Sequence, residues 1–295
     1  MDRYDKRPDL NVPVLKMLVS GSGLRQIARA LDVDPRSVQQ KLVKFGSHAA
    51  RLHQNLCVAL PAGRTFVLDE EETYEHAISR PLTVALLVDA ETRLLVGASV
   101  GPIRRLARRG SLRRRRQEAD ERRNGRRPDA SRRCVRAVLE QLALLVPEGS
   151  VGIRSDQKGS YATLIRELFG FRAVHETTSG RSPRTPQSPL FPINQTIEML
   201  RDNCGRLEPQ SWLVSKRAER LSQHLSLFTV FRNYVRRRFN KDERRETAAV
   251  ILGLLPRQLT WAELLAWRQD WGASSLHPMD ESGQSRIGNR SPTAA

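Results

Sequence analysis

The sequence predicts an α/β fold in which a mixed sheet with flanking helices is preceded by a small all-α domain. Apolar residues recur at helical spacing over residues 10–46. Four short apolar runs of strand length then occupy residues 65–156, with one helical segment between the third run and the fourth. With 295 residues, the chain is long enough for one large domain or two modest ones.

The N-terminal part, residues 1–60, is predicted to form a helix-turn-helix domain. Apolar spacing predicts a first helix from Leu24 to Leu31. Asp34, followed by a proline, can cap a second helix, which Gly46 is expected to end.

The second helix of this motif is expected to enter the major groove of double-stranded DNA. Arginine and glutamine side chains can read guanine and adenine edges, and lysine side chains contact phosphates. The residues expected on the DNA-facing side are Arg36, Gln39, Gln40, Lys41 and Lys44. The alternative is a helical hairpin that makes no DNA contact.

The second part, residues 61–271, begins with the predicted sheet. Strands are predicted at residues 65–68, 82–88, 94–100 and 150–155. A short turn joins the second and third strands as a hairpin. This order fits a ribonuclease-H-like layer, in which a parallel strand extends an antiparallel hairpin sheet.

Helices are predicted after the third strand and in the C-terminal half. They cover residues 135–146, 161–169, 195–206, 216–238 and 259–271. The tail, residues 272–295, is rich in Ser, Gly and Pro and is expected to be disordered.

The charge balance predicts a polyanionic partner. The formal net charge is +18 and the sequence pI is about 11.0, which favours nucleic acid; a basic protein that binds ribosomal RNA is the alternative. The sequence has no apolar run of membrane-spanning length and no signal peptide, so we expect no membrane partner and a cytoplasmic, nucleoid-associated protein. Cys57, Cys134 and Cys204 are far apart, so no zinc site is expected.

An arginine-rich insertion occupies residues 104–133. It holds fourteen arginines and four carboxylates, and so contributes +10 of the net +18. We expect a flexible, solvated segment that grips DNA phosphates beside the active site. A second basic set over residues 232–245 is expected to do the same. The further DNA contacts we expect are Arg113, Arg114, Arg115, Arg116, Arg201 and Lys216.

Two aspartates carry the candidate chemistry, because each directly follows a predicted strand. Adjacent strand ends can bring Asp69 and Asp156 to one spot, and carboxylate oxygens are ligands for divalent cations. An isolated aspartate at a strand end is more often a turn residue or a cap, so the pair alone also fits a structural role.

The residues around these aspartates form three blocks. The first is Leu-Asp-Glu-Glu-Glu-Thr-Tyr at 68–74, and the second is Arg-Ser-Asp-Gln-Lys-Gly-Ser-Tyr at 154–161. The third comprises Asn-Gln-Thr-Ile-Glu-Met-Leu-Arg at 194–201, Arg-Leu at 206–207 and Ser-Trp-Leu-Val-Ser-Lys at 211–216. In this order and spacing, the blocks resemble the catalytic blocks of insertion-sequence transposases of the IS-one type, members of the DDE superfamily.

The resemblance implies a ribonuclease-H-like catalytic domain with an acidic triad that holds two Mg²⁺ or Mn²⁺ ions. It implies a DNA transposase that binds mobile-element ends, cleaves the DNA and transfers the freed 3′-hydroxyl to target DNA, as a homo-oligomer on DNA. Asp69 and Asp156 match the first two catalytic and metal-binding positions.

The third triad position departs from the family pattern. Asn194 stands where the family has a glutamate, and we expect it to bind metal through its carbonyl oxygen. Glu198, one helical turn further on, is the alternative third position, and Asn194 could instead cap a helix. A neutral residue there keeps two other interpretations open: a non-enzymatic helix-turn-helix regulator with a decayed catalytic fold, and a simple nuclease.

Overall fold

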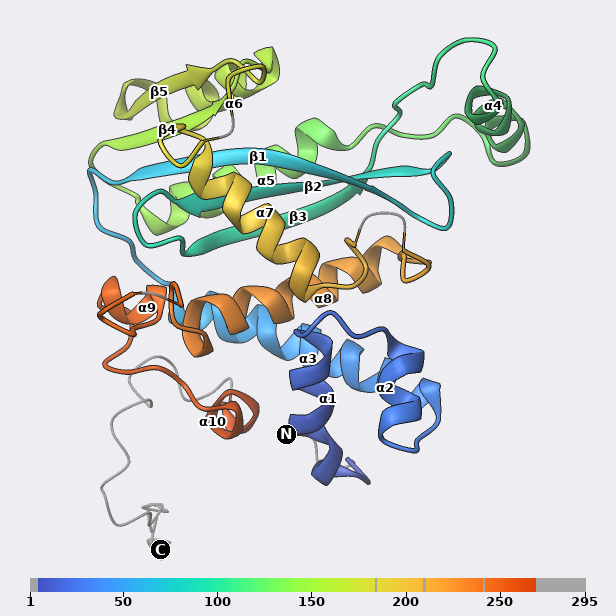
Figure 1. Ribbon diagram of the computed structural model, residues 1–295. Coiled ribbons are helices and arrows are strands. Elements are labelled where there is room, and N and C mark those ends of the chain that lie inside the picture. Colours follow the sequence, from blue (N-terminus) through green and yellow to red (C-terminus); the bar gives the residue numbers. More distant parts are fainter. Residues whose placement is uncertain (1–4, 184, 209–210, 241, 269–295) are drawn as a thin grey trace, which may run out of the picture.

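A computed structural model describes residues 5–183, 185–208, 211–240 and 242–268 (Figure 1). The tail predicted to be disordered, residues 272–295, lies outside this part of the chain.

A five-stranded mixed sheet forms the centre of the protein. Its order is β3-β2-β1-β4-β5. β2 is antiparallel to β1 and β3, whereas β4 is parallel to β1 and β5. The strands are β1 (Thr65–Tyr74), β2 (Pro81–Asp89), β3 (Leu95–Pro102), β4 (Val151–Asp156) and β5 (Ala173–Thr178). This is the ribonuclease-H-like mixed sheet that the sequence predicts.

Helices pack on both faces of the sheet, and β1 shows why. Its side chains alternate, so that Phe66 and Leu68 join one apolar cluster and Val67 joins another. α5 (Ser131–Leu145) and α6 (Gly159–Phe169) contribute to the first cluster, and α7 (Phe191–Asn203) contributes to the second. α7 crosses the sheet in Figure 1, and α8 (Ala218–Val230) runs below it.

β1 is longer than the sequence predicts. Asp69 does not follow the strand but lies within it, paired with Leu86 of β2, and the acidic run to Glu72 continues the pairing as far as Thr83. The apolar residues of β2 supply the partner strand, so long-range pairing overrides the low strand propensity of carboxylates. β5 was not predicted, because its sequence, Ala-Val-His-Glu-Thr-Thr, lacks an apolar run.

Three helices precede the sheet, and the second and third lie where the sequence predicts the helix-turn-helix. They are α1 (Asn11–Leu18), α2 (Leu24–Ala30) and α3 (Pro35–Leu56). The Asp34 carboxylate accepts a hydrogen bond from the Arg36 backbone N–H at 2.6 Å, as a helix cap should. The predicted end at Gly46 is wrong, since α3 continues for ten further residues to Leu56.

These three helices pack on the rest of the protein. One apolar cluster includes Leu42 and Leu52 of α3 together with Leu227 of α8 and Trp267. The domain boundary at residue 60 stays a prediction.

The arginine-rich insertion contains a helix, α4 (Leu112–Asn124), which lies away from the sheet (Figure 1). The Ser111 hydroxyl caps it by accepting a hydrogen bond from the Arg114 backbone N–H. The sequence predicts a flexible, solvated segment here and did not predict this helix.

Short elements complete the described chain. The helix predicted at 216–238 is α8 followed by a π-helical turn, η3 (Phe231–Val235), where it ends. The other short elements are η1 (Pro8–Leu10), η2 (Gly170–Arg172), α9 (Ala248–Ile251) and α10 (Trp261–Ala266). Within the described ranges, no helix combines the length and the apolar character that crossing a membrane requires.

Candidate active site

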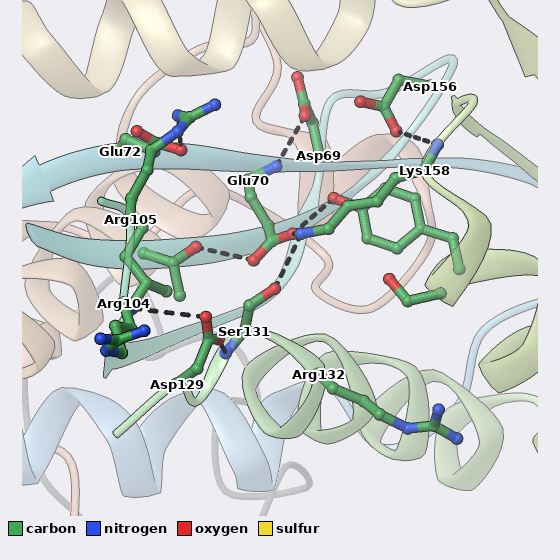
Figure 2. A pocket seen from close by; sticks show the side chains of 14 residues that line it. Asp69, Glu70, Glu72, Arg104, Arg105, Asp129, Ser131, Arg132, Asp156 and Lys158 are labelled. Carbon is green, nitrogen blue, oxygen red and sulfur yellow. Dashed lines mark hydrogen bonds and ion pairs between the residues drawn. The ribbon is translucent and has the colours of Figure 1, made fainter. Parts of the chain in front are cut away.

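Asp69 and Asp156 line the same hollow, which has a volume of about 490 Å³ (Figure 2). The register of the sheet brings them together. β1 and β4 pair in parallel as far as Val67 opposite Arg154, and each aspartate lies two residues further along its strand. The sequence predicted this meeting, although from a strand end in the case of Asp69.

Burial and charge make Asp69 an unusual acid. Burial raises its pKa to about 6, and the neighbouring carboxylates, with Asp156 first among them, raise it as well. The Glu70 backbone N–H opposes this by donating to the Asp69 Oδ1 at 2.7 Å. Asp156 thus disfavours the ionisation of Asp69, and a cation between the two side chains would stabilise the charged form of Asp69.

Glu70 points to the opposite face of β1 from Asp69 and lies within a hydrogen-bond network. Its carboxylate is ion-paired with Lys158 and accepts hydrogen bonds from the hydroxyls of Tyr161 and Thr83, each at 2.8 Å. Burial raises the pKa of Glu70, but hydrogen bonds led by that from Lys158 outweigh burial, so the net shift is downward. This network was not predicted from the sequence, although the lysine and the tyrosine of the second block are residues that could have indicated it.

Basic side chains line the hollow beside these carboxylates. Arg104, Arg105 and Arg132 all contribute to its wall. Arg105 is ion-paired with Glu72, and the Arg104 Nε donates to Glu121 of α4 at 2.8 Å. A hollow with carboxylates in its floor and guanidinium groups in its wall suits a phosphodiester, which needs cations around an attacked phosphorus.

Neither candidate for the third triad position lines this hollow. Glu198 is exposed and ion-paired with Arg201 at 2.7 Å, and the guanidinium of Arg201 also forms a bidentate pair with Glu71 at 2.8 Å. Asn194, Glu198 and Arg201 share one flank of α7, and the contact with Glu71 turns this flank towards the face of β1 that carries Asp69.

The side chains of the hollow match the ligands of a divalent cation only in part. Asp69 and Asp156 offer carboxylate oxygens in one partly buried place, as a divalent cation requires. In the part of the chain that the structure describes, no three histidine, cysteine, aspartate or glutamate residues are grouped to hold a metal ion. The pair fits one shared cation, and a third ligand from α7 is not in place.

The predicted recognition helix, α3, exposes most of its expected DNA contacts. Arg36, Gln39, Gln40 and Lys44 are exposed. Lys41 is an exception that corrects the prediction: it is buried, and its Nζ donates to the Asp5 Oδ1 at 3.1 Å and to the Arg7 carbonyl at 2.9 Å. Because Lys41 binds the N-terminal segment, its ammonium group is not available to contact a phosphate.

The remaining predicted DNA contacts lie in different places. Arg115 and Arg116 of α4 and Lys216 before α8 are exposed. Arg114 is half-buried and pairs with Glu118 at 2.7 Å, and Arg113 is half-buried on the same helix.

Comparison with known proteins gives structural likenesses only. No protein-family model and no curated protein matches the sequence. The HTLV-2 integrase catalytic core domain, in complex with magnesium and in a trimeric form, is 12% identical, with 66% of this chain and 99% of that chain covered and a TM-score of 0.34. The catalytic core domain of BIV integrase is 14% identical, with 65% and 94% covered and a TM-score of 0.32.

A third solved structure is the simian T-cell lymphotropic virus intasome in complex with the PP2A regulatory subunit B56 gamma. It is 12% identical, with 84% of this chain and 74% of that chain covered and a TM-score of 0.36. The assignment of the fold rests on the strand order and direction described above.

Proposed function

We propose that the protein is a DNA transposase of the IS-one type, which cleaves DNA at mobile-element ends and joins the freed end to target DNA. The observation that carries this proposal is the meeting of Asp69 and Asp156 in one hollow with a basic wall. The three sequence blocks that resemble the transposase family contain both residues, so motif and geometry agree.

Asp69 and Asp156 would hold Mg²⁺ or Mn²⁺. When bound, such an ion favours the attacking hydroxyl as a nucleophile and offsets charge on the leaving oxygen. Arg105, Arg132 and Lys158 of the same hollow would hold the phosphate diester in position by charge. Glu70 keeps Lys158 in place through their ion pair.

DNA binding would come from two further surfaces. α3 would enter the major groove with Arg36, Gln39 and Gln40, while the exposed arginines of α4 would contact phosphates without regard to sequence. We also propose a homo-oligomer on DNA and a cytoplasmic, nucleoid-associated location.

The test of the reaction uses double-stranded oligonucleotides that carry the element ends, with Mg²⁺ or Mn²⁺ added. Asp69→Asn and Asp156→Asn should each lower cleavage by more than about 100-fold, because a ligand of the catalytic ion is lost, and should leave DNA affinity within about threefold. Asp129→Asn is the matched control: Asp129 lines the same hollow, accepts a hydrogen bond from the Ser131 backbone N–H, and should retain activity. Normal cleavage by Asp156→Asn would overturn the proposal.

The third metal-binding position has its own test. We expect Asn194→Glu to raise metal affinity and cleavage, because a charged ligand compensates a divalent cation better than an amide does. Glu198→Gln should change cleavage little. The opposite pattern, with Glu198→Gln inactive and Asn194→Glu neutral, would assign the position to Glu198.

A second candidate function is a DNA-binding regulator whose catalytic fold has decayed. The observation that favours it is the absence of Asn194 and Glu198 from the hollow. Specific DNA binding without cleavage in Mn²⁺ would support the regulator. Cleavage without strand-transfer products would instead indicate a nuclease.

A further inference from the structure

A second cluster of cationic side chains lies outside the candidate active site. Arg93 comes from the turn between β2 and β3, Arg232 from η3, and Arg236 and Arg238 from the segment that follows η3. We call these four residues the arginine cluster.

Arg232 is the buried member of the cluster. Its exposed fraction is 0%, and its Nε, Nη1 and Nη2 have no hydrogen-bond partner. Its pKa is lowered to about 9, mainly by burial and also by the nearby charges of Arg236, Arg93 and Arg238. A buried guanidinium that donates no hydrogen bond is costly, so the native protein needs an acceptor at this place.

Arg93 and Arg238 are held side by side although both are cations. Each donates to the backbone carbonyl of Glu91 at 3.4 Å. Their guanidinium carbons also lie over the same ring, that of Phe239, at 5.6 and 4.9 Å from its centroid. One neutral carbonyl and one aromatic ring do not balance two charges, so this pair also leaves positive charge uncompensated.

The carboxylates around the cluster are too few to neutralise it. Asp242 forms an ion pair with Arg238 at 2.8 Å, and Asp89 forms one with Arg64, outside the cluster, at 2.7 Å. Asp202 acts on Arg236 only as a nearby charge. Across the described ranges, no salt bridge within 4.0 Å joins a carboxylate to Arg93, Arg232 or Arg236.

The position of the cluster relates it to the candidate active site. The Arg93 Nε donates to the Gln195 Oε1 at 3.3 Å, and Arg236 contacts the sulfur of Met199. Both partners belong to α7, and Gln195 is the neighbour of Asn194. An anion on the cluster would therefore lie beside the helix that carries the proposed third metal-binding position.

We propose that the arginine cluster binds a phosphate group of the DNA backbone and so holds a DNA strand beside the start of α7. Guanidinium groups match phosphate oxygens in charge and in hydrogen-bond geometry. Arg93, Arg236 and Arg238 are only partly buried and would contact the phosphate, and the charge of the buried Arg232 would add to theirs. That the phosphate belongs to DNA rests on the proposed function.

The first experiment measures anion binding by the full chain without DNA. Thermal unfolding in sodium phosphate is compared with sodium chloride at equal ionic strength, and we expect phosphate to raise Tm by a few degrees. Arg232→Met should lose this rise, since methionine fills the space without charge. Arg93→Asn is the second variant, because asparagine tolerates the positive φ of 65° at this position. Arg166→Met, which removes an exposed charge on α6, is the matched control and should keep the rise.

The second experiment measures binding of short random-sequence duplex DNA at several salt concentrations. Losing one phosphate contact should reduce the slope of log affinity against log salt by about 0.9. Arg93→Asn removes such a contact and Arg232→Met removes the buried charge that completes the site, so both should show this reduction and Arg166→Met should not. An equal phosphate response in all variants would overturn the site. If the two variants lose the rise in Tm with phosphate but keep the salt slope of the parent for DNA binding, the cluster binds free phosphate and the assignment to DNA is overturned. Neither readout depends on cleavage, so failure of the transposase proposal would be seen separately.

Discussion

Asp69 is a residue whose burial works against folding at neutral pH. Its pKa is about 6 in the folded protein against an ordinary value of 3.8, so the folded state holds its proton more tightly than the unfolded chain does. Stability therefore falls as pH rises from about 4 to about 6, and the full cost, about 3 kcal/mol, is present above that range. A residue kept at such a cost is typical of a functional site.

The burial of the Asp69 carboxylate predicts how this residue affects stability when no metal is bound. Asp69→Asn should raise Tm at pH 7.5 in the presence of a chelator, because the amide carries no charge to desolvate, and the gain should vanish at pH 4. Added Mg²⁺ should raise the Tm of the parent and not that of the variant. Glu148→Gln, at an exposed carboxylate, is the control that should show neither effect. If Asp69→Asn is less stable than the parent at pH 7.5, the burial of a charged Asp69 is not costly.

Other residues show that a cation's role depends on its partners. Lys41 and Arg201 both have the charge expected of DNA contacts. In the folded protein Lys41 binds Asp5, and Arg201 binds Glu71 and Glu198. The Lys41–Asp5 and Arg201–Glu71 pairs join segments far apart in the sequence, so they stabilise the fold and reduce the charge that either cation can offer to a phosphate.

At the scale of elements, the packing of α3 against α8 explains why a glycine lies inside a long helix. A Cβ on Gly46 would come within 2.5 Å of the Gln223 Cβ and within 2.8 Å of the Gln223 backbone. The absence of a side chain permits the close approach of the two helices. The glycine is therefore required by the helix contact and is not a helix end.

We predict that Gly46→Ala destabilises the protein by about 1–3 kcal/mol, because the overpacking cost exceeds the gain in helix propensity. Gly159→Ala is the matched control, since a Cβ there meets nothing within 4 Å at the start of α6. Urea unfolding of both variants measures the difference. Equal stability of Gly46→Ala and the parent would show that α3 and α8 can separate without cost.

At the scale of the whole molecule, buried histidines connect the N-terminal helices to the rest of the chain. The His224 Nε2 of α8 is hydrogen-bonded to the Leu18 carbonyl of α1 at 2.7 Å. His53 of α3 is bonded to the Tyr234 hydroxyl at 2.8 Å and to the Val96 carbonyl of β3 at 2.9 Å. The N-terminal helices are thus tied to the rest of the chain by polar contacts as well as by the shared core.

These histidines predict acid sensitivity. Burial lowers the pKa of His224 to about 4 from an ordinary 6.5, so the stability it contributes is present above pH 6.5 and is lost as pH falls towards 4. Relative to His224→Gln, the parent should lose about 2 kcal/mol between pH 7 and pH 5, as urea unfolding would measure. His76→Asn, at an exposed position with a positive φ of 62°, should behave like the parent. Parallel pH profiles for the parent and His224→Gln would mean that His224 is not buried in neutral form.

The sequence by itself determined the features that depend on neighbouring residues. Short apolar runs located β2 and β3 and placed Asp69 and Asp156 near the ends of segments that pair, and the aspartate before Pro35 located the start of α3. Helix caps, turns and apolar runs involve only a few neighbouring residues, so they can be read along the chain without knowledge of distant contacts.

Only the tertiary structure decided which distant residues meet. Strand pairing extended β1 through its acidic run and turned Asp69 and Glu70 to opposite faces of the sheet. Packing made Gly46 a point of helix contact, and folding gathered the arginine cluster from positions 93 to 238. These outcomes depend on the register of the sheet and on packing between separate segments of the chain, and no local propensity encodes such contacts.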